Sequence, residues 1–122
     1  MPRVIHFEIP AADLDRAEKF YAGVFGWKIE KWAGPMDYRL ATTGPDGEPG
    51  INGAIMAREG PQSAVVNTVD VPSIDEAMRK VAAAGGKVLT PKMPVPGIGW
   101  AARCQDTEGN TFGLMQADPA AR

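Results

Sequence analysis

Two segments of the chain share one layout: VIHFEIPAADLDRAEKFYAGVFGW at residues 4–27 and VVNTVDVPSIDEAMRKVAAAGGKV at residues 65–88. Each stretch begins with an extended apolar run, continues as an amphipathic segment of about three helical turns, and stops at glycine before another extended run. Few letters match position by position, so the repeat is one of pattern. The copies lie about 60 residues apart, a spacing that predicts two modules of one architecture.

The composition is that of an ordinary globular domain. The chain has 122 residues, 44% of them hydrophobic, and a net charge of −2, which is enough for one domain with a real core. Its 13 basic residues are scattered and outnumbered by 15 acidic ones, so we expect no nucleic-acid partner. No apolar run approaches the ~20 residues of a membrane span, and residues 1–10 lack a signal-peptide layout. The single Cys104 rules out an internal disulfide and favours a cytoplasmic location.

Residues 4–9 are predicted to form a strand whose two faces differ, because side chains alternate along a strand. One face carries apolar side chains expected in the core: Ile5, Phe7 and Ile9. The other face is polar enough to line a cavity: Val4, His6 and Glu8.

Two helices follow their strands with recognisable ends. Asp13 is a predicted N-cap and Gly26 a left-handed stop for the first helix, and Ser73 with Glu76 forms a capping box for the second. Apolar residues at helical spacing are expected to pack inward in the first helix: Leu14, Ala17, Phe20, Tyr21, Val24 and Phe25. The corresponding buried stripe of the second is Ile74, Ala77, Met78 and Val81.

The remaining strands complete a βαβββ order in each half. One strand begins at Trp27, and the others are expected at residues 38–42, 54–57, 65–71, 87–89, 100–104 and 111–115. Glycine and proline mark a turn-rich link at residues 42–53 and a loop at residues 92–100. We therefore predict an α+β fold, a single domain of two modules at about residues 3–58 and 63–118.

This order, together with DLDRAEKFYAGVFGW at residues 13–27 and DTEGNTFGLMQ at residues 106–116, resembles the vicinal oxygen chelate superfamily. That group includes glyoxalase I, bleomycin-resistance proteins and extradiol dioxygenases. The resemblance covers about residues 4–116. It implies mixed and antiparallel sheets forming a half-barrel around a cavity, and a homodimer, with the modules pairing within one chain or swapping between two.

The resemblance also implies where a divalent metal would be held in glyoxalase I-like members, by four side chains on the cavity face. The four positions fall here on His6, Met56, Val66 and Gly113. Only His6 is a metal-ligand type, and one imidazole cannot hold a catalytic metal. The alternative, improvised ligands at Glu8 and Asp70, is the less favoured reading. We expect no cofactor, with a divalent metal as the minor possibility.

Eight residues are candidates for lining the cavity: His6, Glu8, Tyr38, Asn52, Met56, Asp70, Trp100 and Gly113. His6 is the one candidate catalytic residue, as a base or a ligand contact, against the alternative of a histidine satisfied by a neighbour. Tyr38, Met56 and Trp100 stack on a planar ligand or are plain core. Asn52 either binds a ligand or has a structural role in the turn. Cys104 is expected to be a buried small hydrophobe.

Three functions remain open from the sequence. The leading one is metal-independent binding of a small molecule, with His6 and Glu8 as polar contacts. The second is a glyoxalase-type lyase, isomerase or dioxygenase that uses improvised or dimer-supplied ligands. The third is a drug-sequestering resistance protein that catalyses nothing. The sequence names no ligand.

Overall fold

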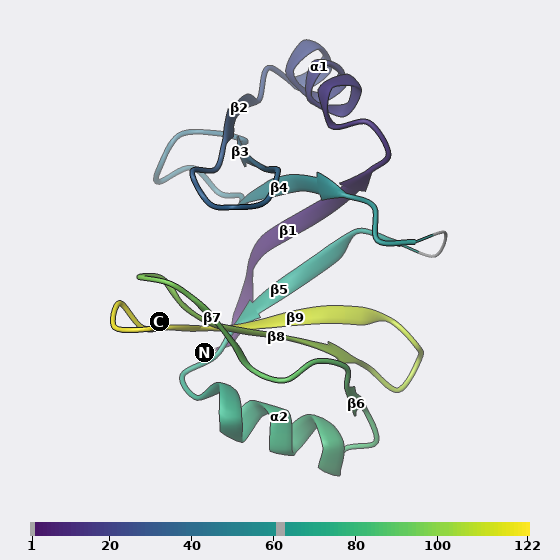
Figure 1. Ribbon diagram of the computed structural model, residues 1–122, viewed down its shortest axis with the longest axis vertical. Coiled ribbons are helices and arrows are strands. Elements are labelled where there is room, and N and C mark those ends of the chain that lie inside the picture. The colour runs from purple at the N-terminus through teal and green to yellow at the C-terminus, as the bar shows by residue number, and fades with distance from the viewer. Residues whose placement is uncertain (1, 61–62) are drawn as a thin grey trace. The chain divides into compact units, whose positions relative to one another are not determined.

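Figure 1 shows the computed structural model of the chain, which describes residues 2–60 and 63–122. The fold is α+β and consists of two βαβββ-like modules, as predicted. The chain divides into two compact units, which we describe separately. The first unit is His6–Val65, and the second is Val66–Arg122 together with the chain start up to Ile5.

The described residues of the first unit form one helix and four strands. They follow in the order β1 (Arg3–Ala11), α1 (Leu14–Phe25), β2 (Lys28–Lys31), β3 (Tyr38–Thr42) and β4 (Asn52–Ala57). In space the strands run β2-β3-β4-β1. The first two contacts are antiparallel and the β4–β1 contact is parallel. This sheet fixes which side chains share a face.

The two faces of the first unit's sheet separate as the alternation in β1 predicts. Phe7 lies on the α1 side, where its ring centre is 5.7 Å from that of Trp27. We call the opposite side the far face of the first unit. The register places on it His6, Glu8, Tyr38, Leu40, Asn52, Ala54 and Met56. The predicted polar face of β1 is therefore the face turned away from the helix.

Helix α1 begins and ends where the sequence predicted, but fewer of its apolar side chains are buried than predicted. Asp13 Oδ1 accepts a hydrogen bond from the Arg16 N–H at 3.0 Å, and Gly26 closes the helix at φ 72°. The expectation that the whole apolar stripe packs inward is wrong, because three of its members are more than half exposed: Phe20, Val24 and Phe25. Tyr21 and Trp27 stack 5.0 Å apart between α1 and the sheet. With Tyr21 and Trp27 in this space, the neighbouring apolar side chains of α1 stay exposed to solvent.

A charged cluster around Arg39 ties α1 to β3. The Arg39 guanidinium donates to Asp15 at 2.6 Å and Glu18 at 3.2 Å on the helix, and to both oxygens of Asp37 at 3.0 and 3.1 Å. The fork geometry of arginine suits such a bidentate contact. The bond from Arg39 holds the pKa of Asp37 below its ordinary value of 3.8.

We expect Arg39→Met to lower the thermal unfolding midpoint by roughly 3–6 °C at neutral pH, because three carboxylates lose their shared cation. The lowered pKa of Asp37 adds stability above the ordinary carboxyl pKa, and this contribution is lost as the pH falls through the lowered value. The difference between parent and variant should therefore shrink in acid. Calorimetry at neutral and acid pH measures it, and a constant difference would contradict it. Lys28→Met, at an exposed ion pair, is the matched control.

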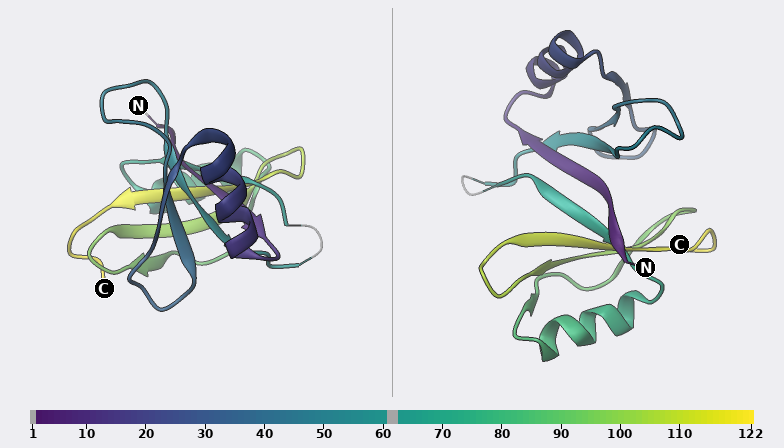
Figure 2. Two further views of the ribbon diagram at one scale, coloured as in Figure 1. Left: turned by 90° about the horizontal axis from the view of Figure 1, so that it is seen from above. Right: turned by 180° about the vertical axis from the view of Figure 1, so that it is seen from behind.

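In the second unit, the part of the chain that the structure describes forms one helix and five strands. Their bounds are β5 (Val66–Asp70), α2 (Ile74–Ala83), β6 (Lys87–Val88), β7 (Met93–Val95), β8 (Gly99–Gln105) and β9 (Thr111–Ala117). The strands run β5-β9-β8-β6, with β7 also paired to β8. Figure 2 shows each helix covering one side of the sheet in its own unit.

Strand β7 lies where the sequence predicted only a proline-rich loop. Met93–Val95 pairs antiparallel with β8, and Pro94 stands opposite Trp100. Proline cannot donate a ladder hydrogen bond, but an edge strand tolerates it. The loop expectation for residues 92–100 is therefore corrected: its first part is a short edge strand.

The core of the second unit lies between α2 and the sheet. Its buried members are Val71, Ile74, Ala102, Cys104 and Leu114, and Ala77, Met78 and Val81 of the predicted helix stripe pack against them. Ser73 caps α2 by accepting from the Glu76 N–H at 3.2 Å. In the described part of the chain, no helix is both long and apolar enough to cross a membrane.

Candidate functional site

The far face of the first unit carries a linked group of three polar side chains. The Tyr38 hydroxyl, on β3, donates to Glu8 Oε2 at 2.6 Å, and the same hydroxyl lies 2.7 Å from His6 Nε2. His6 and Glu8 are two residues apart on β1, so the alternation of a strand turns both toward Tyr38. All three side chains are half-buried. We call this group the His6–Tyr38–Glu8 cluster.

The Tyr38 hydroxyl joins the other two side chains of the cluster. A tyrosine hydroxyl has one proton, and here Glu8 accepts it. The same oxygen is in hydrogen-bond contact with His6 Nε2, whose role as donor or acceptor depends on the imidazole tautomer. Tyr38 thus holds both an imidazole and a carboxylate in fixed orientations.

The ring arrangement makes part of the cluster flat. The planes of His6 and Tyr38 differ by 16°, and their centres are 6.3 Å apart. Because the hydrogen bond joins the hydroxyl to a ring nitrogen at the rims, the rings lie side by side in nearly one plane, not face to face. The two rings form one continuous flat surface.

Trp32 borders this surface, although it was not among the residues predicted for the site. It follows the last residue of β2 and its N–H donates to the Tyr38 carbonyl at 2.8 Å, so both side chains point to the same side. The rings lie 5.8 Å apart at 71°. The sequence held one signal for Trp32, the alternation of side chains along the strand that begins near Trp27. That alternation identifies the face on which Trp32 lies only once the pairing of β2 with β3 is known.

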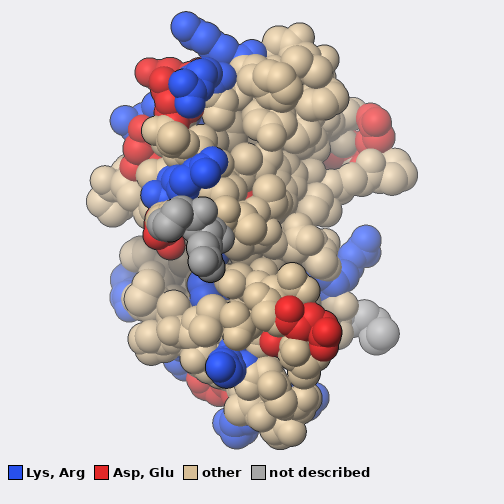
Figure 3. All heavy atoms as spheres, turned by 90° about the vertical axis from the view of Figure 1, so that its right-hand side faces the viewer, with Lys and Arg blue, Asp and Glu red and all other residues tan. Residues whose placement is uncertain are grey.

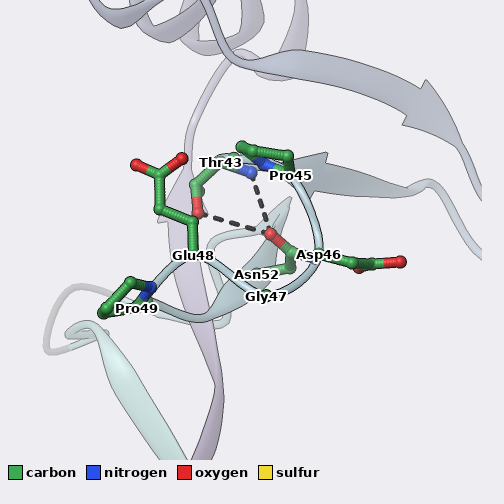
Figure 4. Close-up of a pocket in the computed structure, with 9 residues that line it drawn as sticks. Thr43, Pro45, Asp46, Gly47, Glu48, Pro49 and Asn52 are labelled. Atoms are coloured by element: carbon green, nitrogen blue, oxygen red, sulfur yellow. Dashed lines mark hydrogen bonds between the residues drawn. The ribbon is translucent and has the colours of Figure 1, made fainter.

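Asn52 and Met56 share the far face with different roles. Met56 is buried and stands opposite Tyr38 in the register. Asn52 Oδ1 accepts from the Thr43 N–H at 2.9 Å and from its hydroxyl at 3.3 Å, which closes the link between β3 and β4. Figure 4 shows these bonds. The link itself forms a hollow of about 150 Å³. The structure supports the turn role for Asn52.

In the second unit the predicted site residues fall on both sides of the sheet. Thr68 and Asp70 of β5, with Gly113 and Met115 of β9, lie on its far face, turned away from α2. Trp100 is on the α2 side instead, where it packs against the core and its indole N–H donates to Asp118 at 3.1 Å. Plain core packing, the alternative reading, is thus what the structure supports for Trp100.

Cys104 lies on the same side as Trp100 and is fully buried in the core. Burial raises the pKa of its thiol, which disfavours the reactive thiolate. The prediction of a buried small hydrophobe is confirmed. Arg103 points to the other side, opposite Gly113.

The residues at the family's metal positions do not fit a metal. His6 and Met56 lie on the far face of the first unit, and Val66 and Gly113 on that of the second. Methionine, valine and glycine supply no ligand for a hard or borderline divalent ion. A Cβ at Gly113 would also lie 2.8 Å from Thr68 Oγ1, so the space for a ligand side chain is taken.

The other titratable side chains in the described residues do not supply the missing metal ligands. Among residues 2–60 and 63–122, no three His, Cys, Asp or Glu side chains gather in a group able to hold a metal ion. On the face drawn in Figure 3, charges of both signs occur in small groups between broad uncharged areas.

Comparison with known proteins agrees with this architecture. The profile of the family described as "Bleomycin resistance protein-like N-terminal" matches residues 3–44. A glyoxylase-like domain-containing protein of Didymella fabae is 32% identical over an alignment of 112 residues, and the match covers 88% of each chain.

Two solved structures have the same fold at low identity. Methylmalonyl-CoA epimerase from Mycobacterium tuberculosis has a TM-score of 0.71 at 16% identity, over 95% of this chain and 88% of that one. A glyoxalase/bleomycin resistance protein/dioxygenase superfamily member from Vibrio splendidus 12B01 has a TM-score of 0.67 at 19% identity, over 97% and 100%. With the two-module fold and the related sequence from Didymella, these likenesses lead to one conclusion: the chain belongs to the glyoxalase/bleomycin resistance/dioxygenase, or vicinal oxygen chelate, superfamily.

Proposed function

We propose that this protein binds a small molecule without a metal, using the His6–Tyr38–Glu8 cluster as its polar contact. The observation that carries the proposal is the pair of hydrogen bonds, 2.6 and 2.7 Å long, that meet at the Tyr38 hydroxyl. Side chains held in this way are preorganised, so a ligand that contacts them does not bear the cost of ordering them.

The metal-independent part rests on the chemistry of the four family positions. Three of them carry side chains without a suitable donor, and Thr68 fills the space beside Gly113. His6, the remaining ligand type, is engaged through Nε2 with Tyr38. Elemental analysis of protein purified without chelator or metal-affinity tag should find far less than one divalent ion per chain. Near-stoichiometric metal that His6→Ala releases would overturn this part and favour the metal-dependent enzyme.

Binding is tested with chelator-treated protein and a fragment panel of neutral, cationic and anionic small molecules, followed by NMR of the His6 and Tyr38 rings. Tyr38→Phe should weaken the bound fragments about two- to ten-fold, because His6 and Glu8 lose the hydroxyl that orients them. Tyr21→Phe is the matched control, since Tyr21 lies on α1 among aromatic neighbours. Fragments whose affinity is unchanged by Tyr38→Phe, or is lowered equally by Tyr21→Phe, would contradict the assignment of the cluster as the binding site.

The other expectations remain predictions with their own tests. A drug-sequestering role requires stoichiometric binding of a cationic drug with no product formed, which calorimetry and mass spectrometry distinguish from turnover. The homodimer implied by the family is measured by sedimentation at several protein concentrations.

A further inference from the structure

We infer that the ligand of the His6–Tyr38–Glu8 cluster contains a flat aromatic ring, and that Trp32 selects it. This inference rests on the proposed function and adds the ligand class. The His6 and Tyr38 rings lie within 16° of one plane, joined at their rims by a 2.7 Å hydrogen bond. A surface of two coplanar rings is wider than either ring and matches a flat π-system better than a puckered one.

Trp32 gives this surface a side wall. Its ring stands at 71° to Tyr38, with the centres 5.8 Å apart. Trp32, Tyr38 and His6 are each half-buried, so each keeps part of its surface accessible. A flat ring that lies on Tyr38 would meet the indole at its edge, which is the favourable edge-to-face geometry of aromatic pairs.

The loop after β2 holds Trp32 in this position. A Cβ at Gly34 would overlap the six-membered ring of the Trp32 indole, so the ring packs directly over the Gly34 backbone. Gly34 has no positive φ, so this close approach is the reason for glycine here. Trp32 therefore packs against the Gly34 backbone and against the Tyr38 ring.

The test uses two neutral probes with one carbon skeleton and one hydroxyl, β-naphthol and decahydro-β-naphthol. The saturated probe is the more apolar, so burial of apolar area alone favours it or leaves the two equal. We expect the flat probe to bind at least about ten-fold more tightly and to shift the Trp32 indole N–H signal in NMR, not that of Trp100. Equal affinities, a preference for the saturated probe, or no binding of either would overturn the inference.

Two variants locate the effect. Trp32→Ala should weaken β-naphthol binding about 2- to 12-fold, the range for losing one edge-to-face aromatic pair, and leave the saturated probe unchanged. Trp100→Phe, in the core of the other unit, is the matched control and should change neither affinity. A flat-probe affinity that survives Trp32→Ala, in protein whose NMR spectrum shows the native fold, would sink the proposal.

Gly34→Ala tests the role of Trp32 independently, because it keeps every aromatic side chain but displaces the Trp32 indole. It should lower the preference for the flat probe and move the Trp32 signal in the free protein. If Trp32→Ala does not fold, this variant and Trp32→Phe decide the question. Failure here is distinct from failure of the proposed function. Suppose that Tyr38→Phe weakens a bound fragment but the protein binds β-naphthol and decahydro-β-naphthol equally well. This result would refute the proposal that the ligand contains a flat ring, and the cluster would remain the binding site.

Discussion

Replacing Ile74 by alanine is expected to lower the free energy of unfolding by about 2–5 kcal/mol, the range for truncating a buried isoleucine. Ile74 is the first residue of α2 and is fully buried in the core of the second unit. Its backbone N–H donates to Gln116 Oε1 on β9 at 2.9 Å, so the helix start is fixed to the sheet. The cavity left by the side chain cannot close without moving this anchored turn.

Urea unfolding followed by circular dichroism measures the loss. The matched control is Ile98→Ala, the same truncation in the same unit at a residue that is 52% exposed, and it should cost less than about 1 kcal/mol. Equal costs at the two positions would contradict the packing described for α2. Ile74→Val should lie between them, at about 1 kcal/mol, because it removes only one methylene.

The second large effect is expected for Gly113→Val, which should cost about 1–3 kcal/mol by overpacking. Any side chain at this position meets Thr68, whose Oγ1 would be 2.8 Å from the new Cβ. Both residues are buried and are direct partners in the parallel β5–β9 pair.

A double-mutant cycle tests the cause. Thr68→Ala removes the hydroxyl and the methyl group beside Gly113, so Gly113→Val should cost measurably less in that background than in the parent. An unchanged cost would mean that strain elsewhere, not Thr68, excludes a side chain. The result bears on function, since the family resemblance places the fourth metal ligand at position 113. If the cycle behaves as expected, a ligand side chain at this position has no room beside Thr68.

Local patterns in the sequence were sufficient for the modules and their caps. The helix ends at Asp13, Gly26 and Ser73 depend on residues within four positions, and they are where the sequence predicted them. The alternation in β1 likewise separated Phe7 from His6 and Glu8 correctly. The same alternation should have excluded Trp100 from the cavity face. Trp100 and Cys104 are four residues apart on β8, and Cys104 was already expected in the core.

The polar cluster lay beyond these local patterns. Tyr38 is 32 residues from His6 and 30 from Glu8, and only the β3–β4–β1 register brings the three together. Trp32 was missed for the same reason, because its position opposite Tyr38 depends on where β2 pairs. The exposed side of α1 was also unpredictable from the helix. Periodicity identifies an apolar stripe, but the width of the surface available to cover it decides how much is buried.

Residue identities and local periodicities were enough to predict the doubled βαβββ order and the superfamily resemblance, and to show that three of the four positions where the resemblance places a metal carry no ligand side chain. The surroundings of His6 became visible only with the folded chain. Strand pairing joins it to Tyr38 and Glu8 in a flat surface bordered by Trp32, and Thr68 fills the space beside Gly113. These are contacts between residues distant in the chain, and their distances follow from register and packing, which no local pattern encodes.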